Sequence, residues 1–336
     1  MAGFDCRNNR LARRGLAADG FEDAVRSRVA RYGARRVGVV LGTSTSGILS
    51  TELAYRQRPP EGGPLPAGLN YPGTHSTYSL ADFVRTWLAI EGPACVVSTA
   101  CSSSAKAYAT AARLIHAGLI DAAVVGGVDS LCFTTLHGFA SLELTSADPC
   151  RPYDAARSGI SIGEAAAFGL LERTTDSLDA DAVLLLGYGE SSDAYHMSSP
   201  HPEGLGARLA MEGALARAGL SPADIDYINL HGTATHNNDA AEGYAVAGLF
   251  GSQVAASSTK GITGHTLGAA GALEISISAV AMADGLLPGS VHTRSPDPSI
   301  PIDYVLTSRS APLRHVMSNS FGFGGSNCSV ILGRAG

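Results

Sequence analysis

The chain of 336 residues is long for one ordinary domain, although a single multi-layered α/β domain reaches this size. Hydrophobic residues make up 45% and charged residues only 16%, which supplies ample material for a large buried core. The net charge of −6, with no Lys/Arg block longer than two residues, argues against a nucleic-acid-binding surface.

The six cysteines form no CxxC pair and have no metal-like spacing to histidines, so we expect a reduced protein without a metal site. No signal peptide is recognisable. The most apolar helical stretch, 267–283, is interrupted by Glu274 and by serines, which argues against a membrane span. These features predict a cytoplasmic protein.

The first elements of the chain are predicted as follows. Residues 1–36 are rich in Ala and Arg and indicate a short amphipathic helical region with a solvated basic face. RVGVVLGTSTSG (36–47) predicts a buried strand that runs into a Gly/Ser/Thr turn. Residues 56–76 are rich in Pro and Gly and predict a loop, and a helix is expected at about 79–90.

A strand followed by a helix is predicted for VVSTACSSSAKAYATAARL (96–114), with Cys101 where the two meet. DAAVVGGVDS (121–130) predicts another strand, and its continuous apolar run is typical of strands covered by helices on both faces.

The second half of the sequence shows the same order of elements. A strand is predicted at 183–193, a helix at 202–220 and a strand at 225–235. STAC (98–101) then aligns with STKG (258–261), and each is followed by small residues and a nearly all-apolar helix. We infer a weak internal duplication in which two similar α/β halves pack into one body.

Cys101 is the first candidate for chemistry. Free cysteine is among the most buried residue types, and most such thiols are inert. However, a cysteine in the first turn of a helix lies at the positive end of the helix dipole, which lowers the thiol pKa. The small neighbouring residues also leave room for a substrate. The local pattern supports both a nucleophile and a structural thiol.

Two histidines and a lysine are further candidates. His231 ends a predicted strand, where α/β folds place their chemistry, but a hydrogen-bonded core histidine fits the local pattern equally well. His265 lies near the start of the duplicated helix, five residues after Lys260. Lys260 is one of two lysines in the chain, and its apolar surroundings argue against a surface position. The other, Lys106, is given no role.

SNSFGFGGSN (318–327) is the last distinctive segment. Its glycines permit unusual backbone angles and a close approach of N–H groups to a ligand, although a tight hairpin between edge strands is the alternative. The sequence contains no GxxxxGK[ST] motif and no GxGxxG between a strand and a helix, so no nucleotide cofactor is expected.

Seven segments resemble, in order, the motifs of elongating, two-histidine β-ketoacyl-[acyl-carrier-protein] synthases, and they span about residues 36–333. They are STACSSSAKA, VGGVDSL, CRPYDAARSGISIGEAAA, SSDAYHMSSP, HGTATHNNDAAE, SSTKGITGHTLGAAGALE and NSFGFGGSN. The resemblance implies an α/β, thiolase-like fold of five layers, αβαβα, built from two similar halves. We place these halves at 1–172 and 173–336, forming one catalytic unit that lacks the N-terminal strand–helix segment usual in the family.

The resemblance also implies roles for individual residues. Cys101 matches the nucleophile that accepts the acyl chain. His231 and His265 match the pair that promotes malonyl decarboxylation and stabilises the resulting enolate. Lys260 matches the lysine that supports the second histidine, and Glu164 matches the acidic residue near it.

Three further residues match positions of the family that bind substrate or gate the site. Phe323 matches the gating phenylalanine, whose backbone N–H joins that of the nucleophile in an oxyanion hole. Thr233 and Thr235 match the threonines that hold the phosphopantetheine arm.

The implied substrates are carried on acyl carrier protein, with no further cofactor, and the implied assembly is a homodimer or a heterodimer with a chain-length-factor-like subunit. FDCRNNRLA, RVGVVLGTSTSGI and VGGVDSLC add a narrower resemblance to condensing enzymes of bacterial aryl polyene pathways. Two alternatives remain open. One is a non-catalytic chain-length-factor-like subunit, and the other is a thiolase-fold acyltransferase that hands the acyl group to an alcohol or amine.

Overall fold

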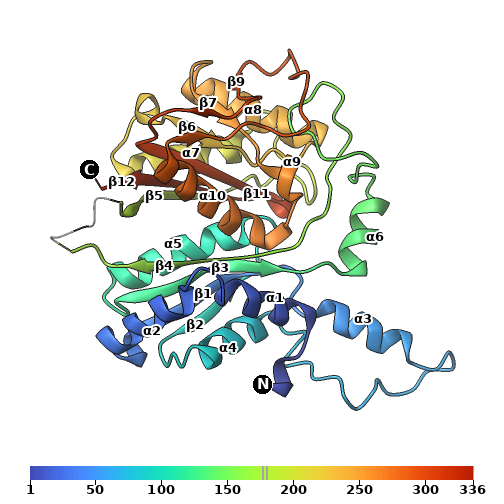
Figure 1. The fold of residues 1–336 in the computed structure, drawn as a ribbon. Helices are drawn as coiled ribbons and strands as arrows, with labels where there is room; N and C mark the ends of the chain where they lie inside the picture. Colours follow the sequence, from blue (N-terminus) through green and yellow to red (C-terminus); the bar gives the residue numbers. More distant parts are fainter. Residues whose placement is uncertain (176–177, 179–180, 336) are drawn as a thin grey trace.

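The computed structural model describes residues 1–175, 178 and 181–335. Two β-sheets lie one above the other, with helices on both outer faces and between them (Figure 1). From bottom to top in Figure 1 the layers are helices α1, α2 and α4, the first sheet, helices α5 and α10, the second sheet, and helices α7 and α8. The five-layered αβαβα prediction is confirmed.

The first sheet has the strand order β2-β1-β3-β4. Its strands are β1 (Val37–Gly42), β2 (Ala94–Val97), β3 (Ala122–Asp129) and β4 (Ala165–Glu172). β1 pairs in parallel with β2 and β3, whereas β4 is antiparallel to β3. The helices below it are α1 (Arg7–Leu16), α2 (Phe21–Tyr32) and α4 (Tyr78–Trp87), and their apolar faces pack against side chains of β1 and β3.

The second sheet has the order β5-β12-β11-β6-β7-β9. Its strands are β5 (Val183–Ser192), β6 (Tyr227–Asn229), β7 (Ala255–Ser257), β9 (Asp303–Tyr304), β11 (His315–Gly322) and β12 (Ser326–Arg334). Its outer face is covered by α7 (Leu205–Ala218) and α8 (His236–Phe250). A separate antiparallel pair joins β8 (Leu286–Leu287) to β10 (Arg309–Ser310).

The topology shows the duplication that the sequence suggests. The second sheet contains the run β7-β6-β11-β12, which has the same order and the same parallel and antiparallel pairings as β2-β1-β3-β4. β12 also pairs with β5 along its far edge, whereas β4 pairs only with β3 within the described ranges. The boundary between 172 and 173 remains a prediction.

The two helices between the sheets form the centre of the core. They are α5 (Ser103–His116), which follows β2, and α10 (Ala270–Asp284), which follows β7 by way of α9 (Lys260–Thr263). Their small apolar side chains pack against both sheets. The stretch Leu267–Asp284 is long and apolar enough to span a bilayer, but it is 61% buried in the protein and is therefore explained as a core helix.

The remaining short elements connect these layers. They are α3 (Ile48–Arg56), α6 (Phe133–Ser141), η1 (Ala2–Phe4), η2 (Ala34–Arg36), η3 (Pro222–Asp224), η4 (Leu267–Ala269) and η5 (Phe323–Gly325). Residues 57–77 contain no helix or strand, as the Pro- and Gly-rich composition predicts. The basic face predicted for residues 1–36 is partly paired instead of merely solvated, because Arg28 contacts Glu172 and Arg36 contacts Asp121.

Candidate active site

Cys101 lies in a tight turn between β2 and α5. The preceding residue, Ala100, has φ 52°, in the left-handed region that residues other than glycine seldom adopt. The sequence predicted Cys101 in the first turn of the helix. α5 begins at Ser103, however, so Cys101 lies two residues ahead of it. The hydroxyl of Ser102 donates to the carbonyl of Thr99 and helps to fix this turn.

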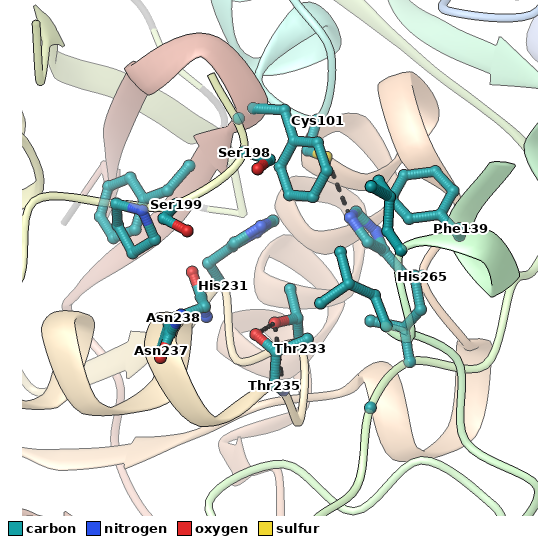
Figure 2. Close-up of a pocket in the computed structure, with 18 of the residues that line it drawn as sticks. Cys101, Phe139, Ser198, Ser199, His231, Thr233, Thr235, Asn237, Asn238 and His265 are labelled. Atoms are coloured by element: carbon teal, nitrogen blue, oxygen red, sulfur yellow. Dashed lines mark hydrogen bonds between the residues drawn. The ribbon is translucent and has the colours of Figure 1, made fainter. Parts of the chain in front are cut away.

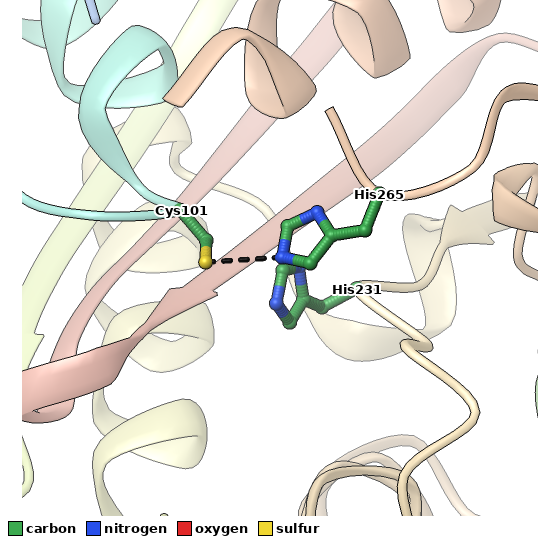
Figure 3. Close-up of side chains that lie close together, drawn as sticks. All are labelled: Cys101, His231 and His265. Atoms are coloured by element: carbon green, nitrogen blue, oxygen red, sulfur yellow. Dashed lines mark hydrogen bonds between the residues drawn. The ribbon is translucent and has the colours of Figure 1, made fainter. Parts of the chain in front are cut away.

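Both candidate histidines meet the cysteine, as Figure 3 shows. His265 Nε2 lies 3.0 Å from Cys101 Sγ. The His231 and His265 rings are nearly perpendicular, with their centroids 5.3 Å apart. The turn after β2 carries the cysteine, and loops after β6 and α9 carry the histidines, so the cluster joins the ends of elements from both sheets.

Lys260 is completely buried and holds His231 in place. Its Nζ lies 3.3 Å from His231 Nδ1, donates to the His231 carbonyl at 2.7 Å, and also donates to the carboxylate of Glu274. An ammonium group can only donate, so Nδ1 of His231 is the acceptor and the imidazole proton resides on Nε2. The lysine thereby fixes His231 as a donor.

The expected position of Glu164 beside this lysine is wrong. The Glu164 carboxylate pairs with Arg7 at 2.6 Å and accepts from the N–H of Leu131 at 3.0 Å, whereas the carboxylate on Lys260 is that of Glu274. The pairing of Glu274 with a buried cation could have been predicted from the sequence, because a lone acid in an apolar core helix needs such a partner. Lys260 also contacts His231, the first histidine, in place of the second.

The electrostatics of the cluster favour neutral imidazoles. Burial lowers the pKa of both His231 and His265 well below its usual value, and the nearby Lys260 charge acts in the same direction. Burial also raises the pKa of the Cys101 thiol to about 11, although Lys260 and the N–H of Phe323 oppose the rise. The expected lowering of the thiol pKa at a helix start is therefore outweighed by desolvation. A base next to the sulfur is needed, and His265 lies in that place.

The glycine-rich segment crosses the cluster as the turn between β11 and β12. The Phe323 N–H is hydrogen-bonded to Cys101, and its ring packs against that of Phe139 on α6 with centroids 5.5 Å apart. Gly322 permits this approach, because a Cβ there would lie 2.8 Å from the carbonyl oxygen of Thr99. The segment therefore brings a backbone donor to the sulfur, as the sequence suggests.

A cavity of about 410 Å³ opens beside Cys101 (Figure 2). Both histidines and Phe323 line it, and it extends to the first turn of α8. Thr233 and Thr235 line the same cavity with their hydroxyl oxygens 2.9 Å apart. Six of the eight predicted site residues therefore line one cavity, and a seventh, Lys260, contacts His231. The eighth, Glu164, is not part of this group.

Cys101, His231 and His265 are also close enough to ligate a single metal ion, since their ligand atoms lie within 4.8 Å of one another. The neighbouring Lys260 ammonium donates to His231 and repels a cation at this place. The arrangement fits proton handling around a thiol better than metal binding.

The buried histidines predict a pH-dependent stability. The unfolded chain takes up protons near pH 6.5 while the folded histidines stay neutral, so their contribution to stability is lost as the pH falls below about 6.5. Burial raises the pKa of Glu242 to about 7 and raises that of Glu274 too, which opposes this loss between about pH 4.5 and 7. Urea unfolding of wild type and of the double variant His231→Gln/His265→Gln at pH 5.0 and 7.5 separates these contributions.

We expect the free-energy difference between the two proteins to be smaller at pH 5.0, by up to about 4 kcal/mol, because each of the two histidines contributes at most about 1.4 kcal/mol per pH unit below pH 6.5. The exposed pair His116→Gln/His196→Gln is the control and should follow wild type. Parallel pH curves for wild type and the His231/His265 variant would contradict buried neutral imidazoles.

The chain matches two sequence profiles, described as the N-terminal domain of β-ketoacyl synthase over residues 15–177 and the C-terminal domain over residues 182–294. It is 42% identical over 260 residues to 3-oxoacyl-[acyl-carrier-protein] synthase 2 of Rhizobium meliloti (strain 1021), a match that covers 73% of this chain and 62% of the relative. The corresponding enzyme of Coxiella burnetii is 36% identical over 316 residues, covering 90% of this chain and 76% of the relative. The chain therefore spans less than two thirds of the first relative.

A solved structure gives the same result. The ketosynthase ApeO from Xenorhabdus doucetiae, determined in complex with its chain length factor ApeC, superposes with a TM-score of 0.91 at 42% sequence identity. The match covers 99% of this chain and 83% of that one. The sequence profiles, the relatives and the fold all agree, and the chain belongs to the β-ketoacyl synthase family.

Proposed function

We propose that this protein is a β-ketoacyl-[acyl-carrier-protein] synthase, which condenses an acyl group on Cys101 with malonyl-acyl carrier protein and releases CO₂. The observation that carries the proposal is the 3.0 Å contact between Cys101 Sγ and His265 Nε2, with His231 beside it in the same cavity. A non-catalytic subunit would have no need of a thiol, a base and a fixed donor in one place.

In the first half-reaction the Cys101 sulfur attacks the carbonyl carbon of an acyl thioester while its proton passes to His265 Nε2. The bond from that carbon to the carrier thiol breaks, and the leaving thiolate takes the proton from His265. Because the thiol pKa is raised by burial, this transfer to His265 replaces a free thiolate. The N–H groups of Cys101 and Phe323 stabilise the oxyanion of the tetrahedral intermediate.

In the second half-reaction the malonyl carbon–carboxylate bond breaks, CO₂ leaves, and the electron pair becomes an enolate. His231 donates from Nε2, the tautomer that Lys260 imposes. His265 ends the first half-reaction with its proton on Nδ1, so it exchanges that proton for one on Nε2 through solvent before it donates to the same oxygen. The enolate carbon attacks the acyl carbonyl and the bond to Cys101 sulfur breaks. One proton from solvent restores the thiol, so atoms and charge balance.

Thr233 and Thr235 lie in the cavity wall, where their hydroxyls suit the amide groups of a phosphopantetheine arm. Phe323 and Phe139 together close the cavity near the sulfur, which suits a gate. The partners in this proposal are acyl carrier protein and either a second copy or a chain-length-factor-like subunit. The relatives' names and the ApeO–ApeC complex support these partners.

The location we propose is the cytoplasm, and the pathway is fatty acid, polyketide or aryl polyene chain elongation. The aryl polyene assignment is the narrowest of these, and it depends on the sequence resemblance together with the similarity to ApeO.

Intact-mass measurement after incubation with acyl-acyl carrier protein tests the proposal. Wild type should gain the mass of one acyl group, and Cys101→Ala should gain none. Cys95→Ala is the matched control, since Cys95 lies on β2 outside the cavity and its loss should leave the adduct unchanged. An unmodified wild-type chain would refute the enzymatic role. Transfer to an alcohol without CO₂ release would favour an acyltransferase.

A further inference from the structure

Asp129 is a buried carboxylate that the proposed mechanism does not use. It ends β3 and accepts hydrogen bonds from five groups, at 2.6–2.8 Å. The donors are the hydroxyls of Thr43 and Thr45 and the backbone N–H groups of Ser44, Thr45 and Gly268. Within the described part of the chain it forms no ion pair, so these donors alone compensate the buried carboxylate.

The segments that Asp129 holds contain strained backbone. Ala100, Ser46 and Leu267 all have φ between 45° and 54°, in the left-handed region. Such a conformation is unfavourable for a non-glycine residue and persists only where the surrounding structure enforces it. Ala100 precedes the nucleophile, and Leu267 is two residues after His265.

Hydrogen bonds connect the carboxylate to both strained segments beside the site. Ser44, whose N–H binds Asp129, donates its hydroxyl to the carbonyl of Ala100 at 3.3 Å. Gly268, whose N–H binds Asp129 at 2.6 Å, follows Leu267 directly. The backbone is tightly packed at this point, because a Cβ on Gly268 would lie 2.7 Å from the Asp129 carboxylate and 2.6 Å from the Ser44 hydroxyl oxygen.

We propose that Asp129 is a positioning residue, which holds the Cys101 turn and the His265 loop in register so that sulfur and imidazole remain in hydrogen-bonding contact. The carboxylate does not touch substrate; it acts through the backbone on either side of the reacting pair. This inference deepens the proposed function, but its first test requires no condensation activity.

The test is the rate at which iodoacetamide alkylates Cys101 in wild type and in Asp129→Asn, followed by intact mass on protein whose fold is checked by circular dichroism. The amide keeps the shape of the side chain but presents an N–H₂ group to donors on one side. Two effects then have opposite signs. Removing the negative charge favours the thiolate and speeds alkylation, since Asp129 raises the Cys101 pKa, whereas losing the His265 contact slows it.

We expect alkylation to slow by about tenfold to a hundredfold, the range that a displacement of about 1 Å produces in an active site. An unchanged or faster rate would overturn the proposal, because Asp129 would then act only on folding or only through its charge. In a condensation assay the same variant should lose kcat with the KM for malonyl-acyl carrier protein unchanged.

A second pair of variants keeps the proposal testable should Asp129→Asn fail to fold. Ser44→Ala removes the link to Ala100 and should slow alkylation severalfold, and Ser44→Thr, which retains the hydroxyl, should restore it. Equal rates for these two variants would refute the link. If alkylation responds as expected in a protein that condenses nothing, the proposed function fails while the positioning role stands.

Discussion

His265→Ala should still take an acyl group onto Cys101, more slowly than wild type, but should release CO₂ from malonyl-acyl carrier protein about 10²–10³-fold more slowly. The acylation defect follows from loss of the base 3.0 Å from the sulfur. The larger decarboxylation defect follows from loss of one of the two donors to the enolate.

His231→Ala is the informative comparison. His231 has no hydrogen bond to the sulfur, so this variant should acylate at nearly the wild-type rate and still lose decarboxylation by a similar factor. Radiolabelled CO₂ release and intact mass measure the two steps separately. If both variants decarboxylate malonyl-acyl carrier protein normally, the assignment of the two histidines is wrong.

Removal of one member of the buried Lys260–Glu274 pair should cost this protein a large part of its stability. Both side chains are buried, with 0% and 1% exposure, so Lys260→Met leaves a carboxylate without its cation. Breaking such a pair costs about 3–5 kcal/mol. In Lys260→Met nothing would hold the proton of His231 on Nε2, so the fraction that folds should also decarboxylate malonyl-acyl carrier protein more slowly.

The double variant Lys260→Met/Glu274→Leu is the internal control. It removes both charges, so the free energy of unfolding in urea should recover most of the loss seen in Lys260→Met. Arg35→Met is the surface control, because Arg35 and Glu91 pair in solvent and contribute little. A single variant as stable as wild type would show that the buried pair is not needed for the fold.

The places of most site residues were predictable, because these residues lie in short sequence motifs, whereas their catalytic roles stay predictions. Cys101, His231, His265 and Lys260 each follow or begin a recognisable element, and the resemblance to β-ketoacyl synthases implied that they share one site. The α6 helix was not predicted, since Phe133–Ser141 has no clear apolar period and uses the Glu52 carboxylate, 81 residues earlier, to bind its first N–H groups.

The errors concern interactions that depend on how distant parts of the sequence come together in three dimensions. Glu164 lies in a matching motif, yet its partner Arg7 is 157 residues away in the sequence, so no local pattern shows the pair. The predicted pKa of the Cys101 thiol is wrong for the same reason. Its position at a helix start predicts a low pKa, and only the packing of both sheets shows that desolvation outweighs this effect.

The separation of 164 positions between Cys101 and His265 in the sequence has a consequence for synthesis of the chain on the ribosome. The cysteine emerges long before the imidazole that serves as its base, and the second sheet must dock before the two meet. A nascent or half-folded chain therefore carries a thiol of ordinary reactivity with no partner to activate it. Acyl transfer from acyl carrier protein to Cys101 needs that partner, unlike simple alkylation of the thiol, so it would report that the second sheet has been made and has docked.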